Sequence, residues 1–221
     1  EVIAVVDGAG DRHVVETRKA PRGRRVETIR EVVEGSGQVQ EHVGSRTFSF
    51  PATAFWQAHS QAPAAYTQLV TEWLGQREYQ ERTAWDLYGG VGLFVPALAA
   101  AVQGKVISVD YSPAATAAEQ PCLADCDVEL KSAKVEQVAA QLPKPGAVVL
   151  DPPRTGAGKD VIRSVAAAAP QAVVHVGCDP ATFARDLHYW DEHGYGIEKM
   201  ALINAFPGTH HFETIALITP A

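Results

Sequence analysis

The sequence contains few cysteines and no long hydrophobic run. Its 221 residues include three cysteines and one methionine, too few for the disulfide framework of a small secreted protein, so we expect a reducing, cytoplasmic location. No apolar stretch approaches the roughly 18 residues that a membrane-spanning helix needs. No basic segment precedes the first apolar residues, as it would in a signal peptide. We therefore expect neither a membrane protein nor a secreted one.

Positive charge is also scarce, because the formal net charge is −7. This balance differs from that of strongly basic nucleic-acid-binding proteins. Between residues 18 and 30, however, a single acid, Glu27, stands among several basic residues: Arg18, Lys19, Arg22, Arg24, Arg25 and Arg30. Phosphate contacts require local rather than overall positive charge. The stretch is therefore either an RNA-contacting surface or a solvated loop.

The hydrophobic pattern changes near residue 50. Residues 1–50 consist of short β-type runs (2–6, 14–17, 26–33, 38–43 and 47–50) separated by glycine and proline, which predicts a small β-rich subdomain, the remnant of a longer N-terminal region. In residues 51–221, strands alternate with helices, which is typical of a mostly parallel, doubly wound sheet. The predicted strands there are 84–88, 105–110, 127–130, 147–150, 172–177, 199–205 and 212–219. The predicted helices are 61–74, 93–102, 113–123, 135–142, 159–169 and 181–193. No helix separates the last two strands, so the final strand is predicted to be antiparallel.

A glycine-rich turn, residues 86–92 (D-L-Y-G-G-V-G), follows the first strand of this second part. Glycine lets the backbone approach a ligand closely, and the first such turn of an open sheet is where nucleotide-like cofactors bind. Asp110 ends the next strand and is suited to bridging ribose hydroxyls. The turn lacks the full pyrophosphate fingerprint of dinucleotide sites and resembles motif I of class I S-adenosylmethionine-dependent methyltransferases. The alternative is a turn that serves packing alone.

Three more chemical groups follow at the ends of later strands. Asp151 begins the loop D-P-P-R after one strand, and Cys178 ends the next strand just before a helix, whose dipole favours a thiolate. Glu213 stands where the last strand begins. Carboxyl ends of parallel strands meet at one edge of a sheet, so we expect these groups to lie together. The alternatives are that Asp151 only caps the turn and that Cys178 only packs as a small, buried hydrophobic side chain.

Two pairs of potential metal ligands lack partners. His210 and His211 are adjacent, and neighbours in an extended chain point in opposite directions. Cys122 and Cys126 have no second pair of ligands at zinc-site spacing. We expect structural or hydrogen-bonding roles for these residues and no metal in this chain.

Five segments, in this order, resemble those of the uracil-C5 RNA methyltransferases, a family that includes the tRNA uracil-54 and 23S rRNA uracil-C5 enzymes. The segments are Phe55-Trp56-Gln57, 86–92, 151–156, 177–186 and 206–213. The resemblance covers about residues 38–219. It implies an α/β fold of the class I methyltransferase type, Rossmann-like, with a mostly parallel seven-stranded sheet and an antiparallel C-terminal strand, preceded by the small β-rich subdomain.

The resemblance also implies roles for individual residues. Cys178 would add to C6 of a uridine in tRNA or rRNA, C5 would take the methyl group of S-adenosyl-L-methionine, and Glu213 would remove the C5 proton. The target base would first leave its stack. The implied cofactor contacts are Gln57, Asp86, Tyr88, Gly89, Gly90, Gly92, Asp110 and Asp151. The implied substrate contacts are Pro152, Arg154 and His210.

Four positions depart from the family pattern. Gly177 and Asp179 replace the usual Ser and Asn beside Cys178, Asn204 replaces an Asp, and Lys134 stands where an acid is expected. The charge of Asp179 is expected to raise the pKa of the Cys178 thiol. These departures leave open a cofactor- or RNA-binding module with lost or altered catalysis.

A methyltransferase acting on another nucleobase is a further alternative. In amino-group methyltransferases an aromatic residue follows the two prolines, where this chain has Arg154. RNA cytosine-C5 enzymes have a cysteine in the same loop, and this chain has none there. Both features disfavour this alternative.

Overall fold

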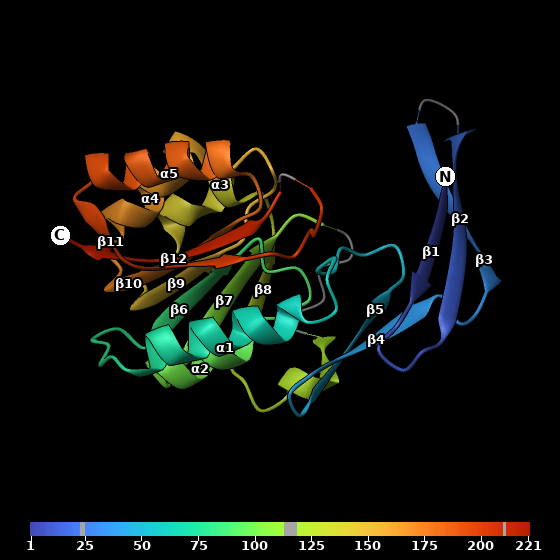
Figure 1. Ribbon diagram of the computed structural model, residues 1–221, viewed down its shortest axis with the longest axis horizontal. Helices are drawn as coiled ribbons and strands as arrows, with labels where there is room; N and C mark the ends of the chain where they lie inside the picture. The colour runs from blue at the N-terminus through green and yellow to red at the C-terminus, as the bar shows by residue number, and fades with distance from the viewer. Residues whose placement is uncertain (23–24, 113–118, 210) are drawn as a thin grey trace.

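Runs of valine, isoleucine and leucine form the centre of a seven-stranded sheet, in the order β11-β12-β10-β9-β6-β7-β8 (Figure 1). The computed structural model describes residues 1–22, 25–112, 119–209 and 211–221. Strands β6 to β10 are parallel, and β12 pairs antiparallel with both β10 and β11, as predicted. The strands are β6 (Thr83–Leu87), β7 (Lys105–Asp110), β8 (Val128–Ser132), β9 (Ala147–Leu150), β10 (Ala172–Gly177), β11 (Tyr195–Ile203) and β12 (Glu213–Pro220).

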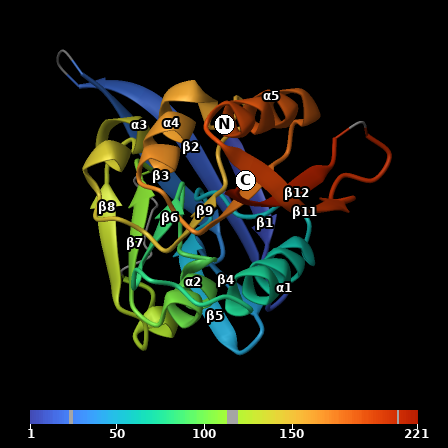
Figure 2. The same ribbon diagram turned by 90° about the vertical axis from the view of Figure 1, so that its left-hand side faces the viewer.

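Helices cover both faces of this sheet (Figure 2). On one face lie α1 (Ala62–Gly75) and α2 (Val95–Val102), and on the other lie α3 (Val135–Val138), α4 (Gly158–Ala167) and α5 (Pro180–Glu192). Apolar side chains of each layer join those of the strands in a separate buried cluster, one on each face. This arrangement confirms the doubly wound α/β fold. Among the described residues, no helix is long and apolar enough to cross a membrane.

Two predicted helices differ from the structure. The helix expected over 135–142 is a single α-helical turn, α3, followed by the 3₁₀ turn η3 (Ala139–Gln141). Leu142 is already extended (φ −73°, ψ 150°) because a residue before proline, here Pro143, disfavours the helical conformation. The helix expected over 113–123 lies largely outside the described residues, and its end is the 3₁₀ turn η2 (Pro121–Leu123).

The first 51 residues form a smaller lobe of antiparallel strands, which Figure 1 shows beside the main body. Its strands are β1 (Val2–Val6), β2 (Arg12–Arg22), β3 (Arg25–Glu34), β4 (Gln38–Val43) and β5 (Arg46–Pro51). Strands β2 and β3 pair from Val14 to Arg22 in one long hairpin. The loop interpretation of the basic stretch is therefore wrong, since its described residues belong to paired strands.

The β4–β5 hairpin attaches this lobe to the main body. Val39, Phe48 and Phe50 belong to the same buried cluster as the side chains of α1 and α2. The side-chain amide of Gln120 also bonds the backbone of Ser49, accepting from its N–H (3.0 Å) and donating to its oxygen (2.8 Å). Packing is thus continuous across residue 50, and the division into domains at that point stays a prediction.

Candidate active site

The glycine-rich turn after β6 is folded onto the end of β7. Tyr88 and Gly90 have positive φ angles (62° and 53°), which make the chain turn sharply. The amide of Tyr88 donates to the Val109 carbonyl (2.8 Å), and the Gly90 amide donates to Asp110 Oδ2 (2.9 Å). The other carboxylate oxygen of Asp110 accepts from the Ser112 amide (2.6 Å). The structure therefore brings the predicted turn and the predicted acid together and holds the acid in place.

Asp86 lies beneath this turn and is fully buried. Its Oδ2 accepts from the Ser108 hydroxyl (3.1 Å), while its Oδ1 has no partner among the described residues. A Cβ at Gly89 would come within 2.3 Å of the carboxylate, so only glycine fits above it. Burial raises the pKa of Asp86 to about 7. This position makes Asp86 a support of the turn, and its direct contact with a cofactor stays a prediction.

A cavity of about 440 Å³ opens at the carboxyl edge of the sheet. It joins a smaller cavity of about 70 Å³ against the turn, which Gly89 and Gly90 line. Of the predicted site residues, the larger cavity collects Gln57, Tyr88, Asp110, Asp151, Pro152, Arg154, Cys178 and Glu213. Gly92 lines neither cavity, and His210 lies outside the described residues.

The ends of two neighbouring strands bring the two predicted catalytic residues to the same cavity. Strand β12 runs antiparallel to β10, with Thr214 paired to Gly177. Cys178 directly follows Gly177 in the chain, and Glu213 directly precedes Thr214. Both residues line the cavity, and the charge of Glu213 acts on the Cys178 thiol. Two segments that are far apart in sequence thus meet at the active edge.

Burial shifts the protonation of this pair. Glu213 is 5% exposed, and burial followed by the charge of Asp151 raises its pKa to about 7, against the opposing effect of Arg154. The pKa of the half-buried Cys178 thiol is also raised, by burial and by the charges of Glu213 and Asp151, while Arg154 lowers it. Glu213 is therefore a carboxyl group that can exchange a proton near neutral pH.

Gln57 connects the segment before α1 to the end of β9. Its side-chain amide donates to Asp151 Oδ2 (2.9 Å). Burial raises the pKa of Asp151 to about 6, and the Gln57 bond works against this rise. The contact places both residues at the junction of the two cavities, since both line each of them.

Two departures from the family pattern have local structural reasons. Asp179 is the N-cap of α5, where its carboxylate accepts from the Thr182 amide (2.9 Å), and its pKa is lowered by that bond. The pKa of Cys178 is raised as predicted, but by burial, Glu213 and Asp151 rather than by Asp179. A Cβ at Gly177 would lie 2.4 Å from the Phe183 ring, so the usual Ser does not fit beside this phenylalanine.

Arg185 and Asp186, at the end of segment 177–186, had no predicted role, and in the structure they anchor the loop after β9. Asp186 on α5 is fully buried and accepts from the Ala157 amide (2.6 Å). Arg185 pairs with Asp186 (2.8 Å) and donates to the Thr155 carbonyl (2.7 Å). In addition, the Thr182 hydroxyl donates to the Arg154 carbonyl (2.9 Å). These contacts fix the backbone of the loop that carries Arg154 into the cavity.

Two aromatic residues of the site were also not predicted as site residues. Phe55 lines both cavities although its side chain is 77% exposed. Tyr66 on α1 is fully buried, and its hydroxyl has no partner among the described residues. Burial and the charges of Glu213 and Asp151 raise the pKa of Tyr66. Phe55 could have been found from sequence, since it belongs to the segment Phe55-Trp56-Gln57. Tyr66 could not, because only the packing of α1 brings it close to the site.

In the described part of the chain, no group of three or more His, Cys, Asp or Glu side chains is arranged to hold a metal ion.

Comparison with known proteins connects this geometry to a family. Residues 136–220, which contain Asp151, Cys178 and Glu213, match the family model described as tRNA (uracil-5-)-methyltransferase. An uncharacterized RNA methyltransferase of Corynebacterium glutamicum is 54% identical over 98% of this chain and 54% of its own length. The chain is thus similar to RNA methyltransferases over almost its whole length. A second relative, an uncharacterized RNA methyltransferase of Streptomyces avermitilis, is 36% identical over 86% of the chain and 44% of the relative.

The chain spans about half the length of the curated relatives it matches. Among solved structures, the tRNA (uracil-54, C5)-methyltransferase of Pyrococcus abyssi in complex with S-adenosyl-L-homocysteine has a TM-score of 0.72 at 24% identity, over 93% of this chain and 50% of that one. The precorrin-6y C5,15-methyltransferase of Geobacter metallireducens has a TM-score of 0.56 at 14% identity, over 72% and 89%. Both confirm the class I methyltransferase fold. Because the two differ in substrate, the fold does not define the substrate of this chain.

Proposed function

We propose that this chain transfers a methyl group from S-adenosyl-L-methionine to C5 of a uridine in tRNA or rRNA. The observation that carries the proposal is that Cys178 and Glu213, at the ends of two neighbouring strands, line the same cavity of about 440 Å³. Uracil C5 is a weak nucleophile, so this reaction needs a thiol to activate the ring and a base to remove the C5 proton. The pair supplies both groups side by side.

The residues act in sequence on the base. The Cys178 thiolate adds to C6, which moves the C5–C6 electron pair towards the C4 carbonyl and makes C5 an enolate-type nucleophile. C5 would then take the methyl carbon from the sulfonium sulfur of the cofactor, whose S–C bond breaks so that S-adenosyl-L-homocysteine leaves. Glu213 removes the C5 proton, the electron pair of that C–H bond restores the C5–C6 double bond, and the cysteine leaves as thiolate. Arg154 favours the thiolate, since its charge lowers the pKa of Cys178.

The glycine turn and the acid at the end of β7 are the parts of the site suited to the cofactor. Gly90 has open space where a Cβ would stand, and Asp110 is held at the end of β7 with its carboxylate towards the turn. Asp110 suits the ribose hydroxyls, and Gln57 and Asp151 stand between the two cavities. When bound, S-adenosyl-L-methionine supplies an electrophilic methyl group. The exposed ring of Phe55 offers a stacking surface for a base extruded from its RNA.

Covalent trapping tests the proposal. Protein, S-adenosyl-L-methionine and tRNA or rRNA transcripts containing 5-fluorouridine are combined and separated on a denaturing gel. Fluorine cannot leave C5 as a proton does, so the adduct persists and a shifted band is expected. Cys178→Ala abolishes the band, whereas the matched Cys126→Ala, at another half-buried cysteine, leaves it unchanged. An equal band with Cys178→Ala would refute the mechanism.

A binding module without catalysis is the second candidate. The raised pKa of Cys178, beside two carboxyl groups, favours it because the thiol is then largely protonated at neutral pH. For such a module we expect S-adenosyl-L-methionine binding by calorimetry together with no trapped band at any pH. A band that grows with pH supports the enzyme instead.

A further inference from the structure

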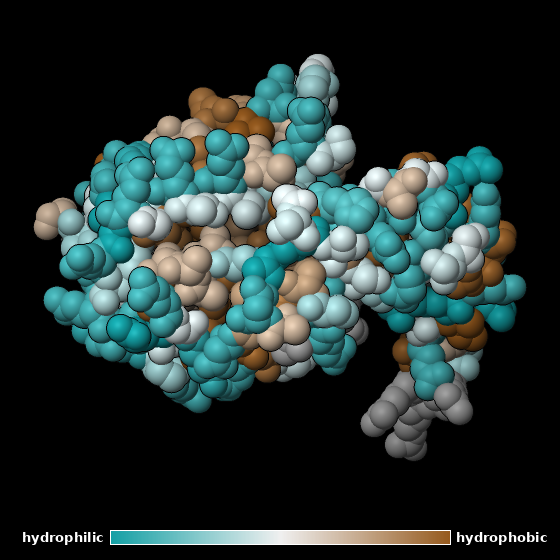
Figure 3. All heavy atoms as spheres, turned by 90° about the horizontal axis from the view of Figure 1, so that it is seen from below, coloured by the Kyte–Doolittle hydropathy of each residue, from teal (hydrophilic) through white to brown (hydrophobic). Residues whose placement is uncertain are grey.

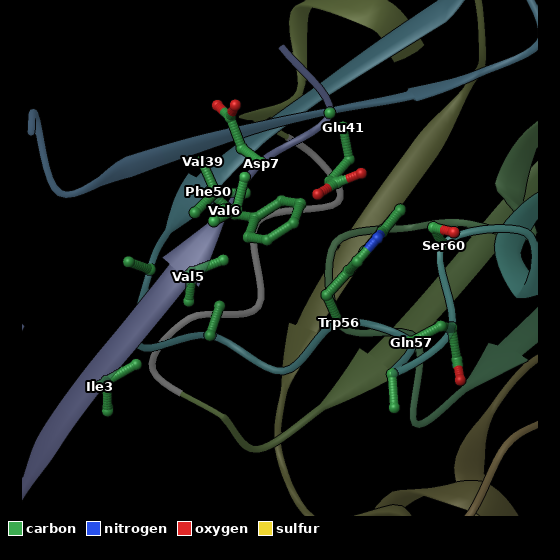
Figure 4. A pocket seen from close by; sticks show the side chains of 14 residues that line it. Ile3, Val5, Val6, Asp7, Val39, Glu41, Phe50, Trp56, Gln57 and Ser60 are labelled. Atoms are coloured by element: carbon green, nitrogen blue, oxygen red, sulfur yellow. The ribbon is translucent and has the colours of Figure 1, made fainter. Parts of the chain in front are cut away.

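A second cavity, of about 410 Å³, lies on the other side of the segment that carries Gln57. Figure 4 shows its apolar side chains, Ile3 and Val5 from β1 and Phe50 from β5, across from Trp56. Gln57 and Ala58 line both this cavity and the active-site cavity. One short stretch of chain is thus the common wall of the two.

The wall carries two neighbouring aromatic side chains. Phe55 lines the active-site cavity, whereas Trp56 lines the second cavity and also the smaller cavity at the glycine turn. The Trp56 ring rests on Phe50, with 5.0 Å between ring centroids and 31° between planes, and on Phe48 at 5.8 Å. This packing holds the partly exposed indole in place. A fixed aromatic face of this kind is a stacking platform for a base.

Two carboxyl groups stand at this cavity, and they differ in their partners. The Asp7 carboxylate already has several hydrogen-bond partners. It accepts from the amides of Ala9 (3.0 Å), Asp11 (2.9 Å) and Gln40 (3.1 Å) and lies near the His13 ring. The carboxylate of Glu41 instead points towards the space between Phe50 and Trp56 (Figure 4).

Glu41 retains accepting capacity. The donor that faces it among the described residues is the Gly8 amide, which already donates to the Gln40 carbonyl (3.0 Å). Burial and the charge of Asp7 raise the pKa of Glu41, because the group is partly desolvated beside a like charge. A ligand that donates a hydrogen bond to the Glu41 carboxylate would stabilise its charged form and offset this desolvation.

We propose that this second cavity binds a nucleobase with an exocyclic amino group, from the same RNA whose uridine enters the active site. Trp56 provides the face on which the base stacks, and Glu41 accepts from the amino group. No lysine or arginine is among the described residues that line the cavity, so its chemistry fits a base rather than a phosphate. The inference rests on the proposed function for the identity of the RNA.

The position and the polarity of the cavity define what it selects. Because Gln57 and Ala58 separate the two cavities, one extended RNA strand can place one of its bases in each cavity. A carboxylate accepts from the N4 amino group of cytosine, as it does in nucleic-acid recognition. Uracil offers only a carbonyl oxygen at that position, so the second cavity discriminates against the base that the active site takes.

Tryptophan fluorescence tests this assignment without any methyl transfer. Trp73, Trp85 and Trp190 are 6%, 0% and 1% exposed, so a stacked base quenches chiefly Trp56. Cytidine monophosphate and uridine monophosphate are titrated separately in the presence of saturating S-adenosyl-L-homocysteine, which occupies the cofactor site. We expect cytidine monophosphate to quench with an affinity about tenfold or more above that of uridine monophosphate, the scale of a lost base contact.

Variants identify the acceptor. Glu41→Gln is expected to weaken cytidine monophosphate about tenfold and to leave uridine monophosphate unchanged, and Glu16→Gln, at an exposed acid of the same lobe, changes neither. Equal quenching by the two nucleotides, no quenching, or an unchanged affinity in Glu41→Gln would overturn the assignment. If cytidine monophosphate binds as expected while no 5-fluorouridine adduct forms, the proposed function fails and the cavity stands.

Discussion

Glu213 and Cys178 show how the environment of a single residue decides its chemistry. Both are ordinary side chains whose protonation is set by burial and by neighbouring charges, that of Asp151 on both and that of Glu213 on Cys178. A catalytic base must be ionised before it can take a proton. With its pKa raised to about 7, Glu213 is protonated in acid and becomes a base as the pH rises through neutrality. The pKa of the Cys178 thiol is also raised, so the fraction present as thiolate continues to increase above neutral pH.

The rate of methyl transfer is therefore expected to increase with pH. Between pH 6 and pH 8 the ionised fraction of a group with a pKa of about 7 rises about tenfold, so the rate rises at least that much. Single-turnover transfer of labelled methyl groups to tRNA or rRNA measures the profile. A rate that is flat or falls across this range would contradict the assignment of the base.

Glu213→Gln separates the two steps of the reaction. Without the base, we expect turnover on ordinary uridine RNA to fall by about 10² to 10⁴, the usual contribution of a positioned base. Cys178 can still add, so a methylated covalent adduct accumulates and is visible on a denaturing gel. The control is Glu72→Gln, at an exposed position of α1. Undiminished turnover in Glu213→Gln would exclude Glu213 as the base.

At the scale of elements, helix α5 serves as the frame for two loops. Its first turn is capped by Asp179 next to Cys178, and its middle holds the loop after β9 through Asp186 and Arg185. The sequence predicted the helix and the strands around it because their periodicity is local. It did not predict that β2, expected over 14–17, extends to residue 22, since that extension depends on pairing with β3.

Asp186→Asn tests the frame. The substitution removes the charge that pairs with Arg185 and weakens the bond to Ala157, so the backbone that carries Arg154 is less well held. We expect at least a tenfold lower rate of adduct formation and a pH profile displaced to the alkaline side, because Arg154 no longer lowers the pKa of Cys178 as strongly.

Asp160→Asn, at an exposed acid of α4 that pairs with Arg163, is the matched control for Asp186→Asn. A purely structural role would reduce the amount of active protein without moving the pH profile. An unmoved profile in Asp186→Asn would thus reject the positioning role.

The whole molecule combines an active edge with an exposed β lobe. Figure 3 shows hydrophobic side chains on the surface of this lobe, and Val2, Val6, Val32 and Val33 are 62%, 63%, 50% and 58% exposed. Three basic residues of the β2–β3 hairpin, Arg18, Lys19 and Arg30, are exposed on the same lobe, among exposed acids of the same strands. We refer to these three residues as the candidate RNA surface of the lobe.

That surface is expected to contact RNA phosphates. Replacing Arg18, Lys19 and Arg30 together with alanine should weaken RNA binding and reduce the slope of log affinity against log salt by about 2, since each single-strand phosphate contact contributes about 0.7. Binding is measured by filter retention over a salt series. The control is the double variant Lys144→Ala and Arg163→Ala. Both residues are exposed and lie in the main body, Lys144 before β9 and Arg163 on α4. An unchanged slope would show that RNA lies elsewhere.

The sequence by itself determined the alternation of strands and helices, the glycine turn and the order of the loops that carry Asp151, Cys178 and Glu213. These are local patterns, set by hydrophobic period and by glycine and proline. The tertiary structure alone decided that Glu213 and Cys178 line one cavity, that Asp179 caps a helix and that Glu41 faces Trp56 across a second cavity. Register, burial and shared walls arise between segments distant in the chain, and they set the pKa values and cavities on which the chemistry depends.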